Sequence, residues 1–476
     1  MLFNSFNFWI IFPFIFSIYW IIPSKFPSIK KLYLIILSYI LYMLWDVAHS
    51  LILFGITILT FWGAIIIERL TNKGNNNHRK KISLIVVLIS FFPLFIFKYY
   101  NFITDSTAQL FADIGFSINL PGLNWAIPIG ISFFSFQAIG YLLDVYHKRI
   151  NAEHNFIDYS LFVSFFPQIT SGPISKADDL IPQLKNLKPF CYKQGVKGLR
   201  LLLWGMFIKV VVADRLGIFT DTVYNNYSFY SGADCFIASI FYSIQIYGDF
   251  AGYSLMAMGI AKCLGINLIN NFNRPYFATS ITSFWKRWHI SLTKWLTSQI
   301  YIPLGGNRCT KIRTYWNIMI TFLVSGIWHG ANWTFIVWGA MHGLLQIIEK
   351  HFNIQKHQTK NILVNFIKIT TTFMLVNFAW ILFRMPTITD ASNVICQIFT
   401  SFPGEILYGA SNSDKILMLL GIIILFSKET IEEFFHDMIH LDLFSPIVRF
   451  SIYIIIFAMI ISIGVLDAGQ FIYVNF

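Results

Sequence analysis

Long apolar runs separated by short polar loops make up most of the chain. Because a helix needs about twenty apolar residues to cross a bilayer, such runs predict transmembrane helices. The best candidates are residues 6–22, 32–45, 50–67, 82–97, 125–143, 199–213, 235–250, 331–349, 366–383, 416–427 and 450–466. Two further stretches, 156–171 and 315–328, are apolar but short or interrupted. The pattern predicts an all-α, polytopic integral membrane protein with about 11–13 membrane segments, organised as a single domain over residues 1–476.

The loops between these runs alternate in charge. Lys and Arg are concentrated in the loops 69–81 and 174–200, whereas the intervening loops near Asp46, Asp105 and Asp214 are acidic or neutral. Short loops rich in Lys and Arg stay on the cytoplasmic side of a membrane. The alternation therefore predicts an N-terminus outside the cell and cytoplasmic loops at 69–81 and 174–200.

The stretch 156–171 lies between two basic loops, one ending at Arg149 and the next starting at Lys176. If both loops are cytoplasmic, this stretch cannot cross the membrane and must re-enter it. Pro167 and Pro173 fit a broken segment of that kind. Irregular backbone at membrane depth is tolerated only where protein or a cavity surrounds it, so we expect a buried re-entrant segment here.

Composition supports a membrane protein and narrows its chemistry. Hydrophobic residues make up 56% and charged residues 12% of the chain, against roughly 25% charged in soluble domains. The net charge of +12 would suit a nucleic-acid partner, but its basic residues lie in short loops, so we expect no nucleic acid. Five cysteines without close spacing indicate neither a disulfide framework nor a thiolate metal site. His436 and His440 have a spacing that a metal could use, but a solvated amphipathic loop explains them better, so no metal site is expected.

Residues 284–296 combine aromatic, basic and histidine side chains, and the hydroxyls of Ser280, Thr282 and Ser283 before them are candidates for the helix N-cap. On a helix, one face carries Trp285, Trp288, His289, Leu292 and Leu296, and the other side carries Lys286, Arg287 and Lys294. This distribution is typical of an interfacial helix that lies in the headgroup plane. His289 is unusual because it lies on the apolar face, where a lone histidine most often forms a structural hydrogen bond.

A turn is expected at residues 301–308. Pro303 and the pair Gly305 and Gly306 end the preceding helix. Backbone N–H groups of paired glycines can cradle a phosphate, but an ordinary turn explains this pair as well. The chain contains no Walker or dinucleotide-binding motif, so the turn alone does not indicate a nucleotide site.

His329 lies in a strongly apolar stretch, between Gly326 and Gly330, which permit close backbone approach. The preceding apolar run, 316–323, is too short to cross a bilayer, so we expect His329 at membrane depth. Ionisable side chains at that depth usually serve function. Histidine has an unperturbed pKa of about 6.5, so His329 can accept a proton near neutral pH.

Two polar residues follow His329. On a helix beginning near His329, Asn332 falls at i+3, a position from which its amide can orient the ring or an acyl carbonyl. His342 lies further along the same apolar run and is expected to pack or to form a hydrogen bond. Neither residue belongs to a nucleophile elbow, a zinc motif or a glycosidase carboxylate pair, and none of these occurs elsewhere in the chain.

Together these motifs resemble those of a known family. The run Ser-Phe-Trp-Lys-Arg-Trp-His-Ile-Ser-Leu at 283–292, the turn at 301–308 and Trp-His-Gly at 328–330 are similar to those of the bacterial membrane-bound O-acyltransferases. The most similar branch is the membrane subunit of alginate O-acetyltransferases, with its peptidoglycan O-acetyltransferase relatives. Further matching segments are 128–134, 144–146, 165–168, 171–174, 209–214 and 471–476, so the resemblance covers most of the chain.

The resemblance implies an enzyme of the bacterial inner membrane that takes an acyl group, acetyl in the simplest case, from a cytoplasmic thioester such as acetyl-CoA. Its acceptor would be an extracytoplasmic polysaccharide such as alginate, or peptidoglycan, reached with a partner acyltransferase protein. No cofactor is expected to stay bound. The histidine of the Trp-His-Gly motif is His329, the implied catalytic base. The second histidine of the family corresponds to His289, in a supporting catalytic role.

Residues near the two histidines are candidates for contacts with the substrates. They are Trp285, Lys286, Arg287, Trp288, Arg308 and Asn332. Lys286, Arg287 and Arg308 supply positive charge where an anionic thioester such as CoA enters from the cytoplasmic face. Basic side chains that anchor a helix to lipid headgroups would have the same pattern.

Two departures from the family pattern keep alternatives open. Leu255 follows Ser254 where alginate-type members usually have an acidic residue, and Thr297 and Ser298 replace a common Arg-Asp pair. In having Leu255 after Ser254, the chain resembles the branch of the family that transfers D-alanine to teichoic acids, so D-alanyl transfer is an alternative. A transporter with intramembrane histidines as a proton relay is another, but it would show paired broken spans in two similar halves, which we do not find.

Overall fold

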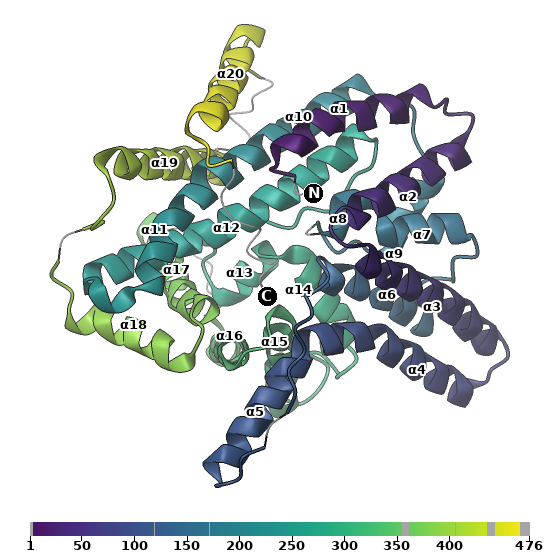
Figure 1. The fold of residues 1–476 in the computed structure, drawn as a ribbon, viewed down its shortest axis with the longest axis horizontal. Coiled ribbons are helices and arrows are strands. Elements are labelled where there is room, and N and C mark those ends of the chain that lie inside the picture. Colours follow the sequence, from purple (N-terminus) through teal and green to yellow (C-terminus); the bar gives the residue numbers. More distant parts are fainter. Residues whose placement is uncertain are drawn as a thin grey trace. The chain divides into compact units, whose positions relative to one another are not determined.

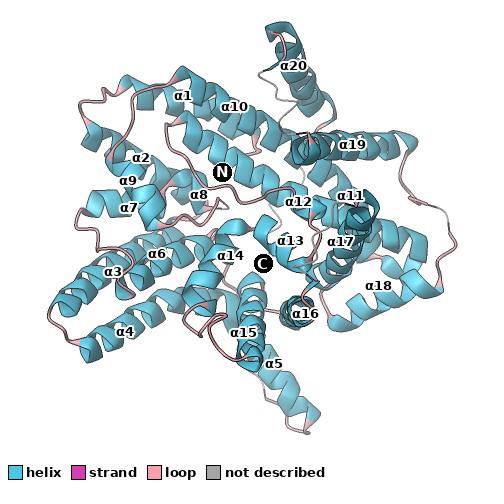
Figure 2. Cartoon of the chain, turned by 180° about the vertical axis from the view of Figure 1, so that it is seen from behind, coloured by secondary structure: helices cyan, strands magenta, loops and turns pink. Residues whose placement is uncertain are grey.

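The computed structural model describes residues 3–118, 120–170, 172–354, 361–404, 406–435 and 443–466. Within these ranges every regular element is a helix, which confirms the predicted all-α class (Figures 1 and 2). The chain divides into two compact units. Unit 1 comprises Met1–Gly198 and Ala257–Ile269, and unit 2 comprises Leu199–Met256 and Asn270–Phe476. The organisation as one functional domain stays a prediction.

Unit 1 is built from helices that begin at side-chain caps and pack through small residues. Its α-helices are α1 (Phe6–Ile21), α2 (Pro27–Met43), α3 (Val47–Asn72), α4 (Asn76–Leu94), α5 (Tyr100–Asp113), α6 (Ile131–Tyr146), α7 (Phe156–Ser164), α8 (Phe166–Ile169) and α9 (Ala177–Lys185), and a π-helical turn at Phe95–Tyr99 joins α4 to α5. Asp46 caps α3 by accepting from the backbone N–H of Ala48 at 2.7 Å. Helix α3 packs on both α4 and α6, where the absence of a side chain at Gly63 admits Val86 and Leu142.

The predicted broken segment at 156–171 is confirmed as two short helices. Helix α7 ends at Ser164 and α8 begins at Phe166, so neither is long enough to cross a bilayer. Polar side chains bind the backbone at the break: Gln137 and Gln168 donate to the Phe162 carbonyl, and the Phe166 N–H donates to Ser38 Oγ at 3.1 Å. The irregular backbone is therefore buried in protein, as a segment at membrane depth requires.

Unit 2 holds the remaining helices. They are α11 (Asp214–Asn225), α13 (Ile281–Arg287), α14 (Ile290–Leu296), α15 (Lys311–His329), α16 (Trp333–His351), α17 (Ile362–Arg384), α18 (Ile388–Thr400), α19 (Asn412–Phe434) and α20 (Pro446–Ile463). Helices α10 (Tyr192–Phe207) and α12 (Gly232–Cys263) contribute residues to both units. Helix α15 runs beside α16, and these two form the most extensive helix pair among the described residues.

Among the described residues, four helical stretches are long and apolar enough to cross a membrane. They are Val47–Asn72, Asn76–Asp113, Ile362–Arg384 and Pro446–Ile463. Shorter apolar helices occur at Asn7–Ile21 and Ile131–Tyr146. The chain is therefore a multi-pass membrane protein, whereas the predicted total of about 11–13 segments and the orientation of the N-terminus stay predictions.

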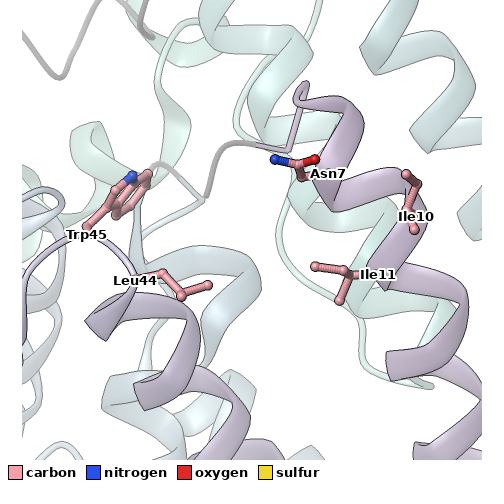
Figure 3. A pocket seen from close by; sticks show the side chains of 5 residues that line it. All are labelled: Asn7, Ile10, Ile11, Leu44 and Trp45. Atoms are coloured by element: carbon pink, nitrogen blue, oxygen red, sulfur yellow. The ribbon is translucent and has the colours of Figure 1, made fainter.

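Unit 1 also contains an open groove of about 430 Å³ between α1 and the end of α2 (Figure 3). It is lined by Asn7, Ile10, Ile11, Leu44 and Trp45. None of these side chains can exchange a proton near neutral pH or carries a charge. This groove therefore offers no group for acid–base chemistry.

Candidate functional site

The predicted continuous helix over 284–296 is wrong, because the backbone breaks at Trp288 and His289. Helix α13 ends at Arg287, α14 begins at Ile290, and His289 has a left-handed φ of 41°. The segment before α13 takes over the backbone hydrogen bonds at the break. The Ile290 N–H donates to the Asn271 carbonyl at 2.9 Å, and the Asn273 N–H donates to the Arg287 carbonyl at 2.9 Å.

The apolar face of this run packs inside the protein, and the predicted interfacial position of the run stays a prediction. Trp285, Trp288 and His289 are all buried inside unit 2. Trp288 packs against Trp380 of α17, with ring centroids 4.9 Å apart. The aromatic side chains thus face other helices of the protein, whereas on the opposite side Lys286 and Lys294 are exposed and Arg287 is partly exposed.

Asn271 holds His289 at the break. The amide oxygen of Asn271 lies 3.2 Å from His289 Nδ1 and accepts from Ser291 at both Oγ, 2.8 Å, and the backbone N–H, 3.1 Å. Because this oxygen only accepts, Nδ1 carries the ring proton of a neutral His289 and Nε2 is left as its basic atom. The predicted structural hydrogen bond of His289 is confirmed. Asn271 itself was missed, since its partners are about twenty residues away in the sequence.

His329 is the last residue of α15, and the next helix, α16, begins only at Trp333, so the prediction that His329 and Asn332 share a helix at i and i+3 is wrong. Gly330 continues in extended backbone, and a Cβ at this position would overlap the ring of Phe335. A Cβ on Gly326 would overlap the Phe335 carbonyl. The close backbone approach predicted for these two glycines is confirmed, and it seats His329 against α16.

Three buried histidines and two tryptophans form a row through unit 2. The Trp328 ring lies between His289, at 5.7 Å, and His329, at 4.9 Å between centroids. The Trp338 ring lies between His329, at 5.0 Å, and His342, at 4.9 Å. His342 both packs and accepts a hydrogen bond from Trp285 Nε1 at 3.3 Å, as predicted for it. The structure therefore brings together two histidines that are 40 residues apart in sequence and adds a third.

A cavity of about 370 Å³ lies next to this row, among α13, α14, α15 and α16. Its lining consists of Thr282, Trp285, Lys286, Thr293, Leu296, Thr297, Tyr301, Asn307, Ile318, Thr321, Phe322, Ser325, Gln346 and Lys350. Lys286 and Lys350 give it two cationic groups. Asn307 accepts from Lys350 and from the Tyr301 hydroxyl. The cavity can therefore hold an anionic or polar group at one part and an apolar group beside Trp285 and Phe322.

Ser325 is the polar residue of the cavity that lies nearest to His329 along α15, one helical turn before it. Its side chain is buried, and its hydroxyl has no hydrogen-bond partner within the described part of the chain. A buried hydroxyl without a partner costs free energy that a bound ligand can recover. Ser325 is a site residue that the sequence-based search missed.

The cavity contains only some of the predicted contact residues. Trp285 and Lys286 line it. Arg308 lies in the exposed turn next to Asn307, where Gly305 and Gly306 adopt positive φ and confirm the predicted turn.

Asn332 and Arg287 have other partners. Asn332 caps α16 by accepting from the Thr334 N–H at 3.0 Å, and its amide donates to the Pro386 carbonyl at 2.7 Å. The Arg287 guanidinium binds both oxygens of Glu433, at 2.8 and 3.0 Å, and that carboxylate also accepts from Arg274 at 2.6 Å. Burial alone would raise the pKa of the Glu433 carboxyl, but its hydrogen bonds with the two arginines and their charge lower that pKa.

A carboxylate from α16 fixes the start of α13. Glu349 accepts from the backbone N–H groups of Ile281 and Thr282, the latter at 2.9 Å, and of the predicted cap hydroxyls it is Ser280 that caps the same helix. Sequence reasoning gave no signal for Glu349, which is remote in sequence from α13.

Among the described residues, no cluster of three or more His, Cys, Asp or Glu could hold a metal ion. His436 and His440 lie outside the described residues.

Residues 146–389 match the family described as MBOAT, the membrane-bound O-acyltransferases. A probable alginate O-acetylase from Pseudomonas aeruginosa is 35% identical over 402 residues, which cover 84% of this chain and 75% of that protein. The peptidoglycan O-acetyltransferase of Helicobacter pylori is 34% identical, over 78% of this chain and 74% of that protein. A teichoic acid D-alanyltransferase from Streptococcus thermophilus is 28% identical, over 49% of this chain and 59% of that protein.

Proposed function

Because the chain belongs to the membrane-bound O-acyltransferase family, we propose that it transfers an acetyl group from cytoplasmic acetyl-CoA to hydroxyl groups of an extracytoplasmic polysaccharide. Family membership makes it a membrane O-acyltransferase, so the transporter hypothesis is set aside. What we propose beyond family membership is the identity of the acyl donor, the identity of the polymer and transfer across the membrane. Two relatives carry names that specify acetyl transfer, one to alginate and one to peptidoglycan, and these names support acetyl as the group.

The observation that carries the proposal is that His329 lies one helical turn from Ser325, which lines the cavity. Ile318, Phe322 and Ser325 of α15 line the cavity, and His329 follows Ser325 by one turn on the same helix. A thioester whose carbonyl reached Ser325 would have its reactive carbon close to a buried histidine. Lys286 and Lys350 stand at the same cavity and suit the phosphates of CoA.

In the proposed reaction His329 is the general base. It takes the proton of the acceptor hydroxyl as the hydroxyl oxygen attacks the thioester carbon; the C–O bond forms, the C–S bond breaks, and the proton passes to the leaving thiolate. The imidazolium formed in between lies at the C-terminal end of α15, where the helix dipole favours positive charge. The Ser325 hydroxyl donates to the carbonyl oxygen as negative charge develops there.

The other predicted residues receive narrower roles. We propose that His289 positions the acceptor through Nε2, because Asn271 occupies Nδ1. Trp285, Lys286 and Arg308 are proposed as donor contacts. Arg287, Trp288 and Asn332 act by holding α13, the aromatic cluster and α16, since each has a structural partner. No bound cofactor is part of the proposal.

We also propose a location in the inner membrane. The alternation of basic loops supports an N-terminus outside and a donor side in the cytoplasm. A partner acyltransferase that carries the acetyl group to the polymer is included in the proposal.

The proposed orientation is tested by single cysteines at Asn76 and Ser228, both exposed, in a background without the five native cysteines. Labelling of both from the same side by an impermeant reagent would refute the topology.

D-alanyl transfer remains a second candidate because of the D-alanyltransferase relative and Leu255. One experiment separates it from acetyl transfer. Membranes carrying the full chain and its polymer receive radiolabelled acetyl-CoA or, separately, radiolabelled D-alanine with its activating enzymes, and label on the polymer is measured. Acetyl label that depends on His329 and persists in His351→Ala, an exposed histidine outside the site, is the expected result. Label from D-alanine alone would contradict the proposal.

A further inference from the structure

Trp285 reaches from the wall of the cavity to His342. The indole Nε1–H donates to His342 Nδ1 at 3.3 Å, and both side chains are buried. A neutral imidazole that accepts at Nδ1 carries its own proton on Nε2, so this bond holds His342 in one tautomer. Proton transfer at His329 uses neither group, and the bond therefore serves another purpose.

His342 is itself fixed by the rings around it. Its imidazole is nearly parallel to Phe284, at 6.4 Å and 9°, and to Phe322, at 6.2 Å and 20°. The edge of Trp338 closes a further side at 4.9 Å. One turn before His342, Gly339 lies so close to α15 that a Cβ would overlap the Phe322 carbonyl. The acceptor atom offered to Trp285 consequently has one well-defined position.

Helix α16 holds α13 at two points. Glu349 binds the two backbone N–H groups at the start of α13, and His342, two turns earlier on α16, binds the Trp285 side chain. A helix as short as α13 has little stability of its own, since helix nucleation is costly. Helix α16 therefore fixes both the start of α13 and the side chain of Trp285.

The indole lies at the cavity wall and is connected to His329 through one further ring. Trp285 lines the cavity, its ring centroid is 5.7 Å from Trp338, and the Trp338 ring is 5.0 Å from His329. Next to Trp285 the lining is apolar, with Phe322 on α15. An acyl chain extending from a thioester carbonyl at Ser325 would meet this ring after a short distance.

We propose that the Trp285–His342 hydrogen bond sets the upper limit on acyl length, with Trp285 as the specificity-determining residue and His342 as a positioning residue. The inference rests on the proposed function, because it takes the cavity as the donor site. To admit a longer chain the indole must turn away, which leaves a buried N–H and a buried ring nitrogen without partners. Such a loss corresponds to about a tenfold or larger penalty in affinity for the longer donor.

The test measures equilibrium binding of acetyl-CoA and octanoyl-CoA to the full-length protein in lipid nanodiscs. His342→Asn keeps an oxygen acceptor close to the position of Nδ1, whereas His342→Leu removes the acceptor and Trp285→Phe removes the donor. His351→Leu serves as a control outside the site. The indole hydrogen bond is read separately, as the ultraviolet resonance Raman signal that Trp285→Phe abolishes.

The expected result is a change in the ratio of the two affinities. Wild type and His342→Asn should prefer acetyl-CoA by about tenfold or more, and His342→Leu and Trp285→Phe should lose most of that preference. The double variant should behave like either single variant. A purely structural role would weaken both donors equally and leave the ratio unchanged, which would overturn the inference.

Two further outcomes separate this inference from the function on which it rests. A wild-type protein that binds both thioesters equally would overturn the length limit alone and leave acetyl transfer standing. A wild-type protein that binds neither thioester would overturn the choice of donor, and the length limit with it. Loss of the preference in His342→Asn, with the Raman signal retained, would also count against the hydrogen bond as its cause.

Discussion

The two histidines of the site are held in different ways. His329 ends a regular helix and owes its position to the close packing of α15 on α16 around Gly326 and Gly339. His289 lies in a backbone break, in left-handed conformation, and owes its position to hydrogen bonds from Asn271. Tight helix packing, which leaves no room for added side-chain volume, fixes His329, whereas the side-chain amide of Asn271 fixes His289. Added volume should therefore harm the first, and loss of one polar group should harm the second.

The largest difference is expected from the histidines themselves. His329→Ala should lower acyl transfer by about 10² to 10⁴, as removal of a general base does, and His329→Gln should fail equally because it lacks basicity. His289→Ala should cost less, because it removes positioning rather than proton transfer. Transfer is measured in membranes with matched amounts of inserted protein. Equal losses in the two alanine variants would remove the distinction between base and positioning residue.

Added volume at the packed region comes next. Gly339→Ala places a methyl group against the Phe322 carbonyl, and overpacking of this kind typically costs about 1–3 kcal/mol of stability. Gly55→Ala is the matched control, since this helical glycine of α3 has open space around it and should be neutral or slightly stabilising. Thermal unfolding in detergent measures both. A Gly339→Ala protein as stable as the control would show that the helix pair can separate without cost.

Removing the side-chain amide of Asn271 tests the region around His289. Asn271→Ala takes away the acceptor for His289 Nδ1 and should lower transfer by about tenfold, with little change in protein amount. Ser291→Ala is the control: it removes one donor to Asn271 but leaves the His289 bond in place. If both variants lost activity to the same degree, the left-handed turn as a whole, and not the His289 bond, would be what matters.

The smallest effect is expected where α13 is tied to α19. The lowered pKa of Glu433 means that its ion pairs with Arg287 and Arg274 add stability above the pKa of an unfolded glutamate. That stability is lost as the pH falls through the lower pKa of the folded protein. Glu433→Gln should therefore lower the unfolding temperature slightly near neutral pH, by the equivalent of ~1 kcal/mol or less, and the difference should vanish in acid. A difference that grew toward low pH would contradict the sign of this linkage.

Features that depend on local sequence were predictable. The apolar runs gave the all-α class, Ser280 capped the helix it precedes, Pro167 marked a broken segment, and Gly326 and Gly330 marked close approach. Each of these properties follows from the residue itself or from its neighbours within a turn. The two histidines were also identified, by resemblance to a family rather than by physics alone.

Features that depend on distant partners were not predictable. The break at His289 exists because residues 271–273 take over backbone hydrogen bonds there, and the helical periodicity of 284–296 contains no sign of this. Arg287 was expected to face a substrate, yet its partner Glu433 is 146 residues away. Ser325 and Glu349 have no motif around them. Their roles arise only when α13, α15 and α16 are brought together.

The left-handed backbone at His289 also bears on how this protein can change over evolutionary time. Asparagine and aspartate adopt this conformation more readily than other residues with a Cβ, and each is one base substitution away from either histidine codon. If His289 positions the acceptor as proposed, a single mutation at this position can give a chain that keeps its fold and loses its activity. Inactive descendants that survive as scaffolds or binding proteins should arise more easily at His289 than at His329.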